Sequence, residues 1–315
     1  MFRMPILRGL LLLAGIAALS FPLPAQDPAQ DEDAPIRVDV TVVNVACTVR
    51  SRKGLVRNLD KTNFRLLEDG APKEIRYFSR QDEMPLNVAL LLDVSGSVVK
   101  FIETEKHTAR RFLETILRPT DTAAVFGFAS SVAVWQEFTP SLDRLKSGLA
   151  KVRATAGPPV FEASRKIGGT LLFDSIHVAS RRLKDKPGAK AVILISDGVD
   201  DGSYSDMEAA IRAAQVAETV VHSICYSDDS TRTDGCVTLK QISQATGGRT
   251  FRMKKHGKLE GVFASIREEI RSQYLLGFAP NSSGRAGFRK LEILTTPNRL
   301  AVNARKGYLA PSSRH

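Results

Sequence analysis

Residues 87–97 read NVALLLDVSGS, and this stretch decides the fold. The continuous apolar run at 88–92 is typical of a strand that is buried on both faces of a parallel sheet. It is followed directly by Asp93. A second apolar run, at 191–195, is likewise followed by an aspartate, Asp197. We therefore expect two central strands of one parallel sheet, each with a carboxylate at its carboxyl end.

Helical and strand-like patterns alternate between residues 85 and 272. Ile102, Phe112 and Ile116 recur at helical spacing, for example, and Pro119 ends that helix. Strands that alternate with helices predict an α/β fold, a doubly wound parallel sheet of Rossmann-like type. The expected helices are 98–116, 142–152, 172–183, 207–217, 239–245 and 259–270, and the further expected strands are 123–128, 132–138 and 220–226.

Both flanks of this α/β region read as β-structure. In residues 36–82, Asp69-Gly70 marks a turn between two short strands, 64–66 and 75–77. In residues 273–315, strand-like runs surround a turn rich in Ser and Gly. Each flank is short for an independent core. We therefore expect both flanks to pair into one small β-domain, with the α/β domain inserted; the alternative is that each flank packs separately.

The first 25 residues have the pattern of a secretory signal peptide. Arg3 and Arg8 give a basic start, and the apolar run from Leu10 to Phe21 is 12 residues long. A spanning helix needs about 20 apolar residues. We expect cleavage after Ala25, a linker at 26–35 and a periplasmic or secreted mature protein. The alternative is an uncleaved N-terminal membrane anchor.

The basic charge of the chain does not indicate nucleic-acid binding. The net charge is +11, but no aromatic residues interleave the basic patches and no nucleic-acid-binding motif occurs. The simple interpretation is a solvated basic surface. The alternative is attraction to an acidic partner or to an anionic envelope surface.

Three cysteines are present, and an exported protein can form disulfides. Cys225 and Cys236 flank a polar loop rich in Asp, and they are the most plausible pair. Cys47 lies in an apolar strand-like run and is expected to be buried as a small hydrophobic residue. No Cys/His spacing typical of a zinc site occurs.

The expected carboxyl edge of the sheet gathers oxygen donors. Open α/β sheets bind ligands beyond the carboxyl ends of their strands. Asp93 is followed there by Ser95 and Ser97, Thr170 opens a helix after two glycines, and Asp197 follows the second apolar run. Oxygen ligands without His or Cys favour a hard cation, Mg²⁺, Mn²⁺ or Ca²⁺. The sequence therefore predicts one divalent-metal site.

This arrangement of Asp-x-Ser-x-Ser, a later Thr and a later Asp-Gly resembles the metal-ion-dependent adhesion site of von Willebrand factor A domains. The resemblance covers residues 87–272 and fills all five positions. It implies that the serines and the threonine coordinate a metal, and that the aspartates bind directly or through water. An open position then takes an acidic side chain of a protein partner, as in cell adhesion. The segments 63–70 and 273–308 resemble the bacterial "VWFA-related" exported family.

The same residues also have a purely structural interpretation. Ser95 or Ser97 would cap one helix, Thr170 would cap the next, and Asp197 would start a turn. The acidic run at 200–206 could form a second cation site, but it lacks EF-hand spacing and is expected to be a solvated loop.

An enzyme is the less favoured alternative. Neither a Gly-x-Ser-x-Gly elbow nor a phosphate-binding Gly-rich Lys loop occurs, and no His or Lys sits beside Ser95 to activate it. His222 lies in an expected buried strand and is interpreted as a core residue. We therefore expect a non-catalytic binding protein. The alternatives are an envelope scaffold with a structural metal site and a Mg²⁺-dependent hydrolase.

Overall fold

The computed structural model describes nine segments of the chain. The expected signal peptide at 1–25, the expected linker at 26–35 and the start of the expected β segment lie outside them, and so does Ser97. In the described part, no helix has the length and apolarity to cross a membrane. The described residues are 42–80, 84–96, 102–153, 159–162, 169–227, 235–254, 259–281, 287–296 and 300–310.

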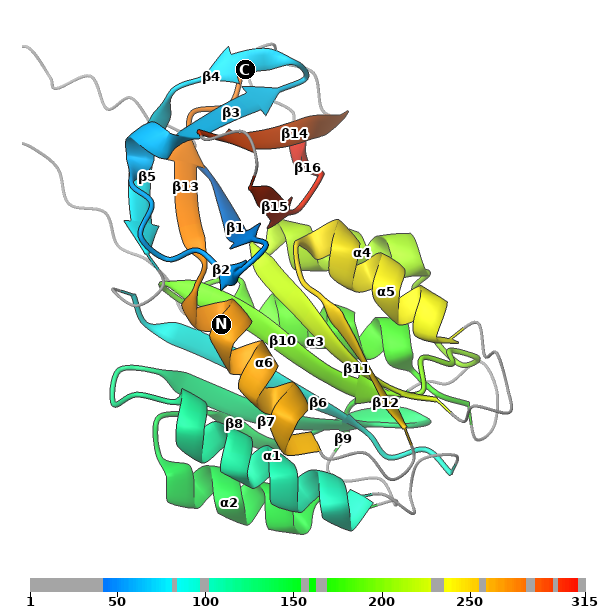
Figure 1. Ribbon diagram of the computed structural model, residues 1–315. Coiled ribbons are helices and arrows are strands. Elements are labelled where there is room, and N and C mark those ends of the chain that lie inside the picture. Colours follow the sequence, from blue (N-terminus) through cyan, green and yellow to red (C-terminus); the bar gives the residue numbers. More distant parts are fainter. Residues whose placement is uncertain are drawn as a thin grey trace, which may run out of the picture. The chain divides into compact units, whose positions relative to one another are not determined.

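The α/β region is built on a seven-stranded sheet in the order β12-β11-β10-β6-β7-β8-β9 (Figure 1). The five strands from β12 to β7 are parallel, which confirms the expected parallel sheet at its centre. β8 and β9 pair antiparallel. The short turn between β7 and β8 allows only a hairpin, since parallel neighbours need a long crossover. The strands are β6 (Leu86–Asp93), β7 (Thr122–Phe128), β8 (Ser131–Thr139), β9 (Pro159–Glu162), β10 (Ala189–Ser196), β11 (Thr219–Ser227) and β12 (Thr250–Lys254).

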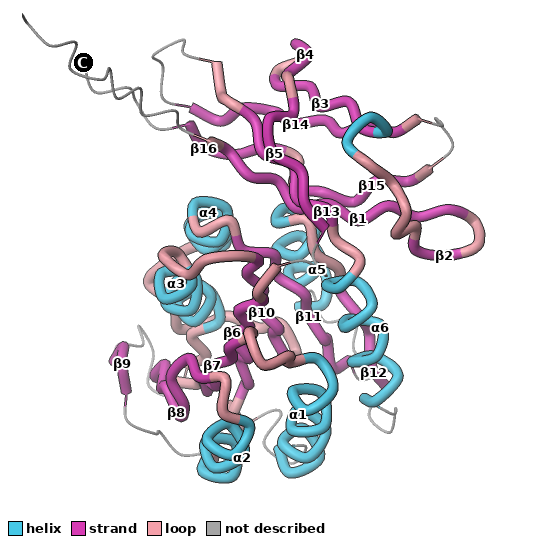
Figure 2. The backbone as a smooth tube through the Cα atoms, turned by 90° about the vertical axis from the view of Figure 1, so that its left-hand side faces the viewer, coloured by secondary structure: helices cyan, strands magenta, loops and turns pink. Residues whose placement is uncertain are grey.

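Helices cover both faces of this sheet (Figure 2). Alternate residues of β6 point to opposite faces: Leu90 and Leu92 pack on the side of α1, α2 and α6, and Ala89 and Leu91 pack on the side of α3, α4 and α5. All eight β6 residues are buried, as the continuous apolar run predicts. The helices are α1 (Ile102–Ile116), α2 (Leu142–Lys151), α3 (Leu172–Leu183), α4 (Met207–Val216), α5 (Gly235–Thr246) and α6 (Leu259–Arg271).

The flanking segments form two further sheets, and each contains strands from both ends of the chain. β1 lies between β13 and β15, and β3 pairs with β14. The boundaries 36–82, 85–272 and 273–315, and the folding of the two flanks as one domain, stay predictions. The first sheet contains β1 (Val43–Ser51), β2 (Gly54–Leu55), β5 (Ile75–Arg80), β13 (Tyr274–Phe278) and β15 (Ala301–Ala304), and the second contains β3 (Phe64–Glu68), β4 (Ala71–Lys73), β14 (Gly287–Thr295) and β16 (Gly307–Ala310).

The turn at Asp69-Gly70 is where the sequence predicts it, but it joins different strands. It connects β3 to β4, with Glu68 opposite Ala71. Both turn residues have positive φ, 50° and 83°, as a two-residue hairpin of this kind requires. The expected partner at 75–77 belongs to β5, which pairs with β13 in the other sheet. A two-residue turn pairs the residues directly on either side of it, here Glu68 and Ala71. A strand that begins at Ile75 starts too late in the chain to be the partner across this turn.

Asp121 ties the entry and the exit of the α/β region together. Its carboxylate is fully buried. It accepts hydrogen bonds from the backbone N–H of Leu86, at the start of β6, over 2.8 Å and from the N–H of Arg118 over 2.7 Å. It also forms an ion pair with Arg271, the last residue of α6. The two chain connections to the flanking sheets therefore leave from one place.

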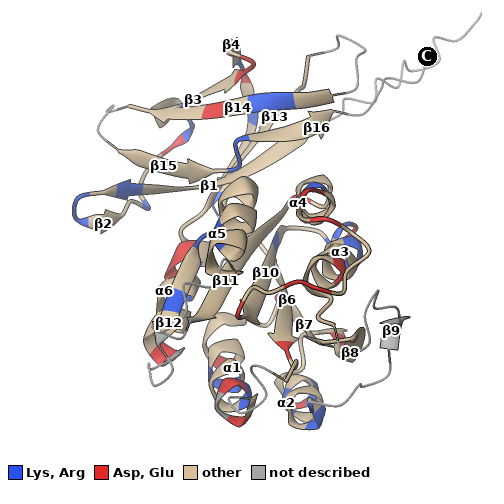
Figure 3. Ribbon diagram, turned by 90° about the vertical axis from the view of Figure 1, so that its right-hand side faces the viewer, with Lys and Arg blue, Asp and Glu red and all other residues tan. Residues whose placement is uncertain are grey.

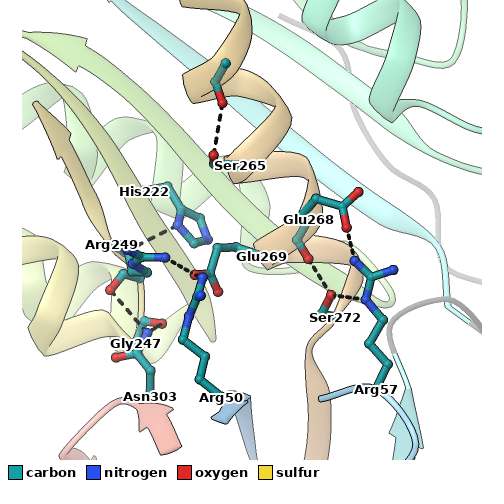
Figure 4. Close-up of polar contacts among 12 residues, drawn as sticks. Arg50, Arg57, His222, Gly247, Arg249, Ser265, Glu268, Glu269, Ser272 and Asn303 are labelled. Atoms are coloured by element: carbon teal, nitrogen blue, oxygen red, sulfur yellow. Dashed lines mark hydrogen bonds and ion pairs between the residues drawn. The ribbon is translucent and has the colours of Figure 1, made fainter. Parts of the chain in front are cut away.

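Glu269 on α6 links the α/β region to β1 (Figure 4). Its buried carboxylate forms ion pairs with Arg50 of β1 and with Arg249, which precedes β12. Burial alone would raise the pKa of the Glu269 carboxyl, but hydrogen bonds from both guanidinium groups bring that pKa below its ordinary value. The backbone N–H of Arg249 also donates a hydrogen bond to Nδ1 of His222 over 3.3 Å. Burial lowers the pKa of His222 to about 4, so it is a neutral core residue, as expected.

We expect Glu269→Gln to lower the free energy of unfolding by about 2 kcal/mol, because it leaves two arginines facing a neutral buried group. The matched control is Glu268→Gln on the same helix. Glu268 pairs with Arg57, and both of these side chains are about half exposed, so its loss should cost less than about 1 kcal/mol. Chemical denaturation measures both. Equal effects of the two substitutions would contradict the assignment of Glu269 as the central link.

Candidate metal centre at the carboxyl edge of the sheet

Asp93 and Asp197 lie at the carboxyl ends of two neighbouring parallel strands, Asp93 as the last residue of β6 and Asp197 directly after β10. In the register of β6 and β10, Leu92 is opposite Ile195, so both strands end at the same level. The Ser196 hydroxyl donates to Oδ2 of Asp93 over 2.6 Å. The negative charge of Asp197 raises the pKa of the Asp93 carboxyl. Figure 3 marks acidic residues along the connection from β10 to α4.

The carboxylate of Asp93 is held in a buried position. Asp93 is 1% exposed. Burial raises the pKa of its carboxyl to about 6; hydrogen bonds from Ser196 and Ser95 oppose that shift, and the charge of Asp197 adds to it. The backbone N–H of Ser95 donates to Oδ1 over 2.9 Å. The chain beyond Asp93 therefore turns over its own carboxylate, which keeps Ser95 at the same edge.

Thr170 is fixed to the loop that follows Asp197. Its N–H donates to Oδ1 of Asp201 over 2.6 Å, and its carbonyl oxygen accepts from the N–H of Gly202 over 3.2 Å. Thr170 does not cap α3, since that helix has Leu171 at its N-cap without a side-chain bond. The Phe173 N–H at the start of α3 donates to Asp200 instead. The capping interpretation of Thr170 is therefore wrong.

Asp197 does start a turn, as the structural interpretation expects. The N–H of Val199 donates to its Oδ1 over 3.1 Å, and Gly198 between them has a φ of +82°. The acidic run that follows is partly exposed, as expected for a solvated loop, and its carboxylates also accept backbone hydrogen bonds. Asp201 accepts a backbone hydrogen bond from Thr170, which precedes α3, Asp200 accepts one from Phe173 at the start of α3, and Asp206 caps α4. These three carboxylates hold the loop in place.

The structure thus brings four of the five predicted site residues to one edge of the sheet: Asp93, Ser95, Thr170 and Asp197. Ser97 lies outside the described residues. Among the residues described, no group of three or more His, Cys, Asp or Glu side chains is placed to hold a metal. The expected donor set does not require such a group, because it combines two carboxylates with three hydroxyls.

Sequence reasoning missed Glu105, a further buried carboxyl near Asp93. Glu105 is on α1 and is 1% exposed. Burial raises its pKa to about 8; a hydrogen bond with Tyr226 opposes that shift, and the charge of Asp93 adds to it. A signal was present in the sequence. Glu105 follows Ile102 by three residues and precedes Ala109 by four, so it is a charged residue on the apolar face of the helix.

The predicted disulfide between Cys225 and Cys236 is present, with a Cα–Cα distance of 5.7 Å. It lies beside the site, since the sulfur of Cys225 is 3.9 Å from the carbonyl oxygen of Asp197. Cys47 is a free, buried cysteine, as expected. Burial raises the pKa of its thiol to about 12, so it is unreactive.

Two glycines make the approach of α5 to this site possible. Gly198, in the turn after Asp197, touches the backbone of Gly235 at the start of α5. A Cβ on Gly235 would overlap the carbonyl oxygen of Asp197, and a Cβ on Gly198 would overlap the carbonyl of Gly235. Only glycine fits at either position.

A doubly wound sheet that gathers oxygen donors beyond its carboxyl edge defines a class of α/β ligand-binding domains. Residues 88–199 match the family model described as the von Willebrand factor type A domain. Over these residues the chain is therefore similar to von Willebrand factor type A domains. No curated protein matches the sequence.

Several solved structures are similar in fold. The conserved hypothetical protein BatB from Bacteroides thetaiotaomicron is 18% identical, with 59% of this chain and 97% of that chain covered and a TM-score of 0.46. The vWF domain of the type V pili tip protein Mfa5 from Porphyromonas gingivalis is 13% identical, with 59% and 95% covered and a TM-score of 0.45. Proximal thread matrix protein 1 from the mussel byssus, with a zinc-occupied MIDAS motif, is 16% identical, with 65% and 50% covered and a TM-score of 0.49.

We expect Gly235→Ala to lower the free energy of unfolding by about 2 kcal/mol, because the new methyl group meets backbone that cannot move aside. The control is Gly261→Ala on α6, where a Cβ would point into open space. That change should raise stability by about 0.5 kcal/mol, since alanine favours a helix over glycine. Thermal unfolding measures both. If Gly235→Ala left the free energy of unfolding unchanged, the close packing of α5 against the Asp197 turn would be contradicted.

Proposed function

We propose that this chain is an exported protein-binding module in which Asp93, Ser95, Ser97, Thr170 and Asp197 hold one divalent cation. Mg²⁺ is the first candidate, with Mn²⁺ and Ca²⁺ as alternatives. The bound cation would attract an acidic side chain of a protein partner. Binding rather than catalysis is the proposed activity.

The observation that carries the proposal is a pair of buried carboxyls without a compensating cation. Asp93 and Glu105 are each 1% exposed. Burial raises the pKa of each carboxyl, to about 6 for Asp93 and about 8 for Glu105, and a neighbouring negative charge adds to each shift; no Lys or Arg among the described residues offsets it. Buried carboxylates are normally paired or bound to a metal. A divalent cation at this edge would supply the missing positive charge.

The chemistry of the donors supports a hard cation. Carboxylate and hydroxyl oxygens suit Mg²⁺, Mn²⁺ and Ca²⁺, whereas the site offers no imidazole or thiolate. Two carboxylates among the five predicted ligands leave the cation electrophilic. A carboxylate from another protein is the natural ligand for such an ion.

Hydrogen bonds around the site hold these donors in fixed positions in the absence of a ligand. The Ser196 hydroxyl orients Asp93, and Asp201 holds the backbone of Thr170. The N–H groups of Tyr204 and Ser205 donate to the carboxylate of Asp174, which fastens the loop to α3. Residues held by packed elements lose little freedom on binding. The arrangement suits recognition of a partner by a rigid edge.

The absence of an activating group in the sequence supports binding over catalysis. The hydroxyls of Ser95 and Thr170 would coordinate the metal and so would not act as nucleophiles. A serine nucleophile also needs an adjacent general base. Neither His nor Lys neighbours Ser95 in the sequence. A partner held through a metal needs no such group.

Calorimetric titration with Mg²⁺ and Mn²⁺ tests the site. Asp93→Ala should abolish binding because it removes a charge and a ligand together, and Ser95→Ala should weaken binding less. Glu208→Gln is the matched control: the Glu208 side chain is 79% exposed and pairs with Arg212 on α4, so its loss should leave affinity unchanged. Circular dichroism confirms that each variant is folded.

Two results would overturn the metal proposal. One is a folded wild type that binds neither cation at millimolar concentration. The other is Asp93→Ala binding as tightly as wild type, which would put the site elsewhere. Capture of envelope proteins with and without EDTA, beside a hydrolase screen with Mg²⁺, separates a binder from an enzyme. Turnover of a substrate would favour the enzyme.

Export is proposed from the segment between Arg3 and Ala25, which combines a basic start with a short apolar run. N-terminal sequencing of the mature protein should begin near Gln26. Met1 retained on a cytosolic product would reject export. Met1 retained on a membrane-bound product would identify the segment as an anchor.

A further inference from the structure

The Cys225–Cys236 disulfide sits against the turn that carries Asp197. Cys225 is near the end of β11 and lies opposite Ser196 of β10. Its sulfur is 3.9 Å from the Asp197 carbonyl oxygen. Cys236 is in the first turn of α5, and both cysteines are buried. The crosslink therefore joins the end of a central strand to the start of a helix, beside a predicted metal ligand.

The turn at Asp197 is held from two sides by this crosslinked pair of elements. On one side is the sulfur of Cys225. On the other is Gly235, the residue before Cys236, whose backbone packs directly on the Asp197 carbonyl and on Gly198. If the start of α5 moved away from β11, the contact with Gly235 would be lost. The disulfide prevents that movement.

The carboxylate of Asp197 depends on the shape of this turn. Its Oδ1 accepts the N–H of Val199 across Gly198, whose φ is +82°. Mg²⁺ demands near-ideal octahedral geometry with short ligand distances. Groups that orient the ligands of a metal change its affinity 10–100-fold when they are removed.

We propose that the Cys225–Cys236 disulfide positions Asp197 for the cation, and that the affinity of the site depends on this crosslink. This inference rests on the proposed metal site. The crosslink is not the only support of α5, because Leu239 and Ile242 of that helix are fully buried in the core. Its removal should therefore loosen the turn while the fold survives.

The test compares Mg²⁺ affinity in the oxidised wild-type chain, in the double variant Cys225→Ala/Cys236→Ala and in Cys47→Ala. We expect about tenfold weaker binding in the double variant. Cys47→Ala removes a buried cysteine far from the carboxyl edge and should leave the affinity unchanged. Titrations are made at a temperature where circular dichroism shows each variant folded. Equal affinity of the double variant and wild type would overturn the proposal.

A second measurement keeps this inference separate from the metal proposal. Hydrogen exchange in EDTA should be about tenfold faster at the Val199 amide of the double variant than in wild type, because its acceptor on Asp197 is no longer fixed. Exchange at Leu90, in the middle of β6, should be unchanged. Unchanged exchange at Val199 would overturn the positioning role. Faster exchange without cation binding in wild type would support it and reject the metal site alone.

Discussion

The parallel pairing of β6 with β10 is the constraint on which the rest of the molecule depends. It places Leu92 opposite Ile195, and so brings Asp93 level with Ser196, one residue before Asp197. Side chains alternate along a strand, so a shift of one residue would exchange the faces of the β6 side chains relative to β10 and separate Asp93 from Ser196. The same burial that stabilises the strand pairing also disfavours the charged form of the Asp93 carboxyl. Core and candidate site are therefore two consequences of one register.

That edge keeps its carboxylates at a cost to stability. Asp93 and Glu105 are both withdrawn from water, and burial raises the pKa of each. A structure selected for stability alone would place apolar residues there. Ser196, Ser95 and Tyr226 moderate the cost by hydrogen bonding. Buried carboxyls with raised pKa values are typical of functional sites.

The sequence predicted the centre of the fold well and its edges poorly. Continuous apolar runs identified β6 and β10 because strands buried on both faces carry an unmistakable pattern. β9, β12 and β16 were not expected: they are four or five residues long and lie at sheet edges, where pairing with one neighbour suffices. Glu105 was missed because its burial depends on the packing of α1 against the sheet. The Asp and Thr positions could be predicted, since topology alone places strand ends together; their hydrogen bonds could not.

The clasp at Asp121 has a mechanical consequence. It joins Leu86, where the chain enters the α/β region, to Arg271, where it leaves. Both connections lie at the edge where the parallel strands begin, opposite to Asp93. Tension applied at the carboxyl edge would run along β6 and α6 together and reach the flanking sheets through two covalent links in parallel. Because Asp121 contacts both Leu86 and Arg271, force on one connection would be shared with the other. The two connections would therefore resist pulling together.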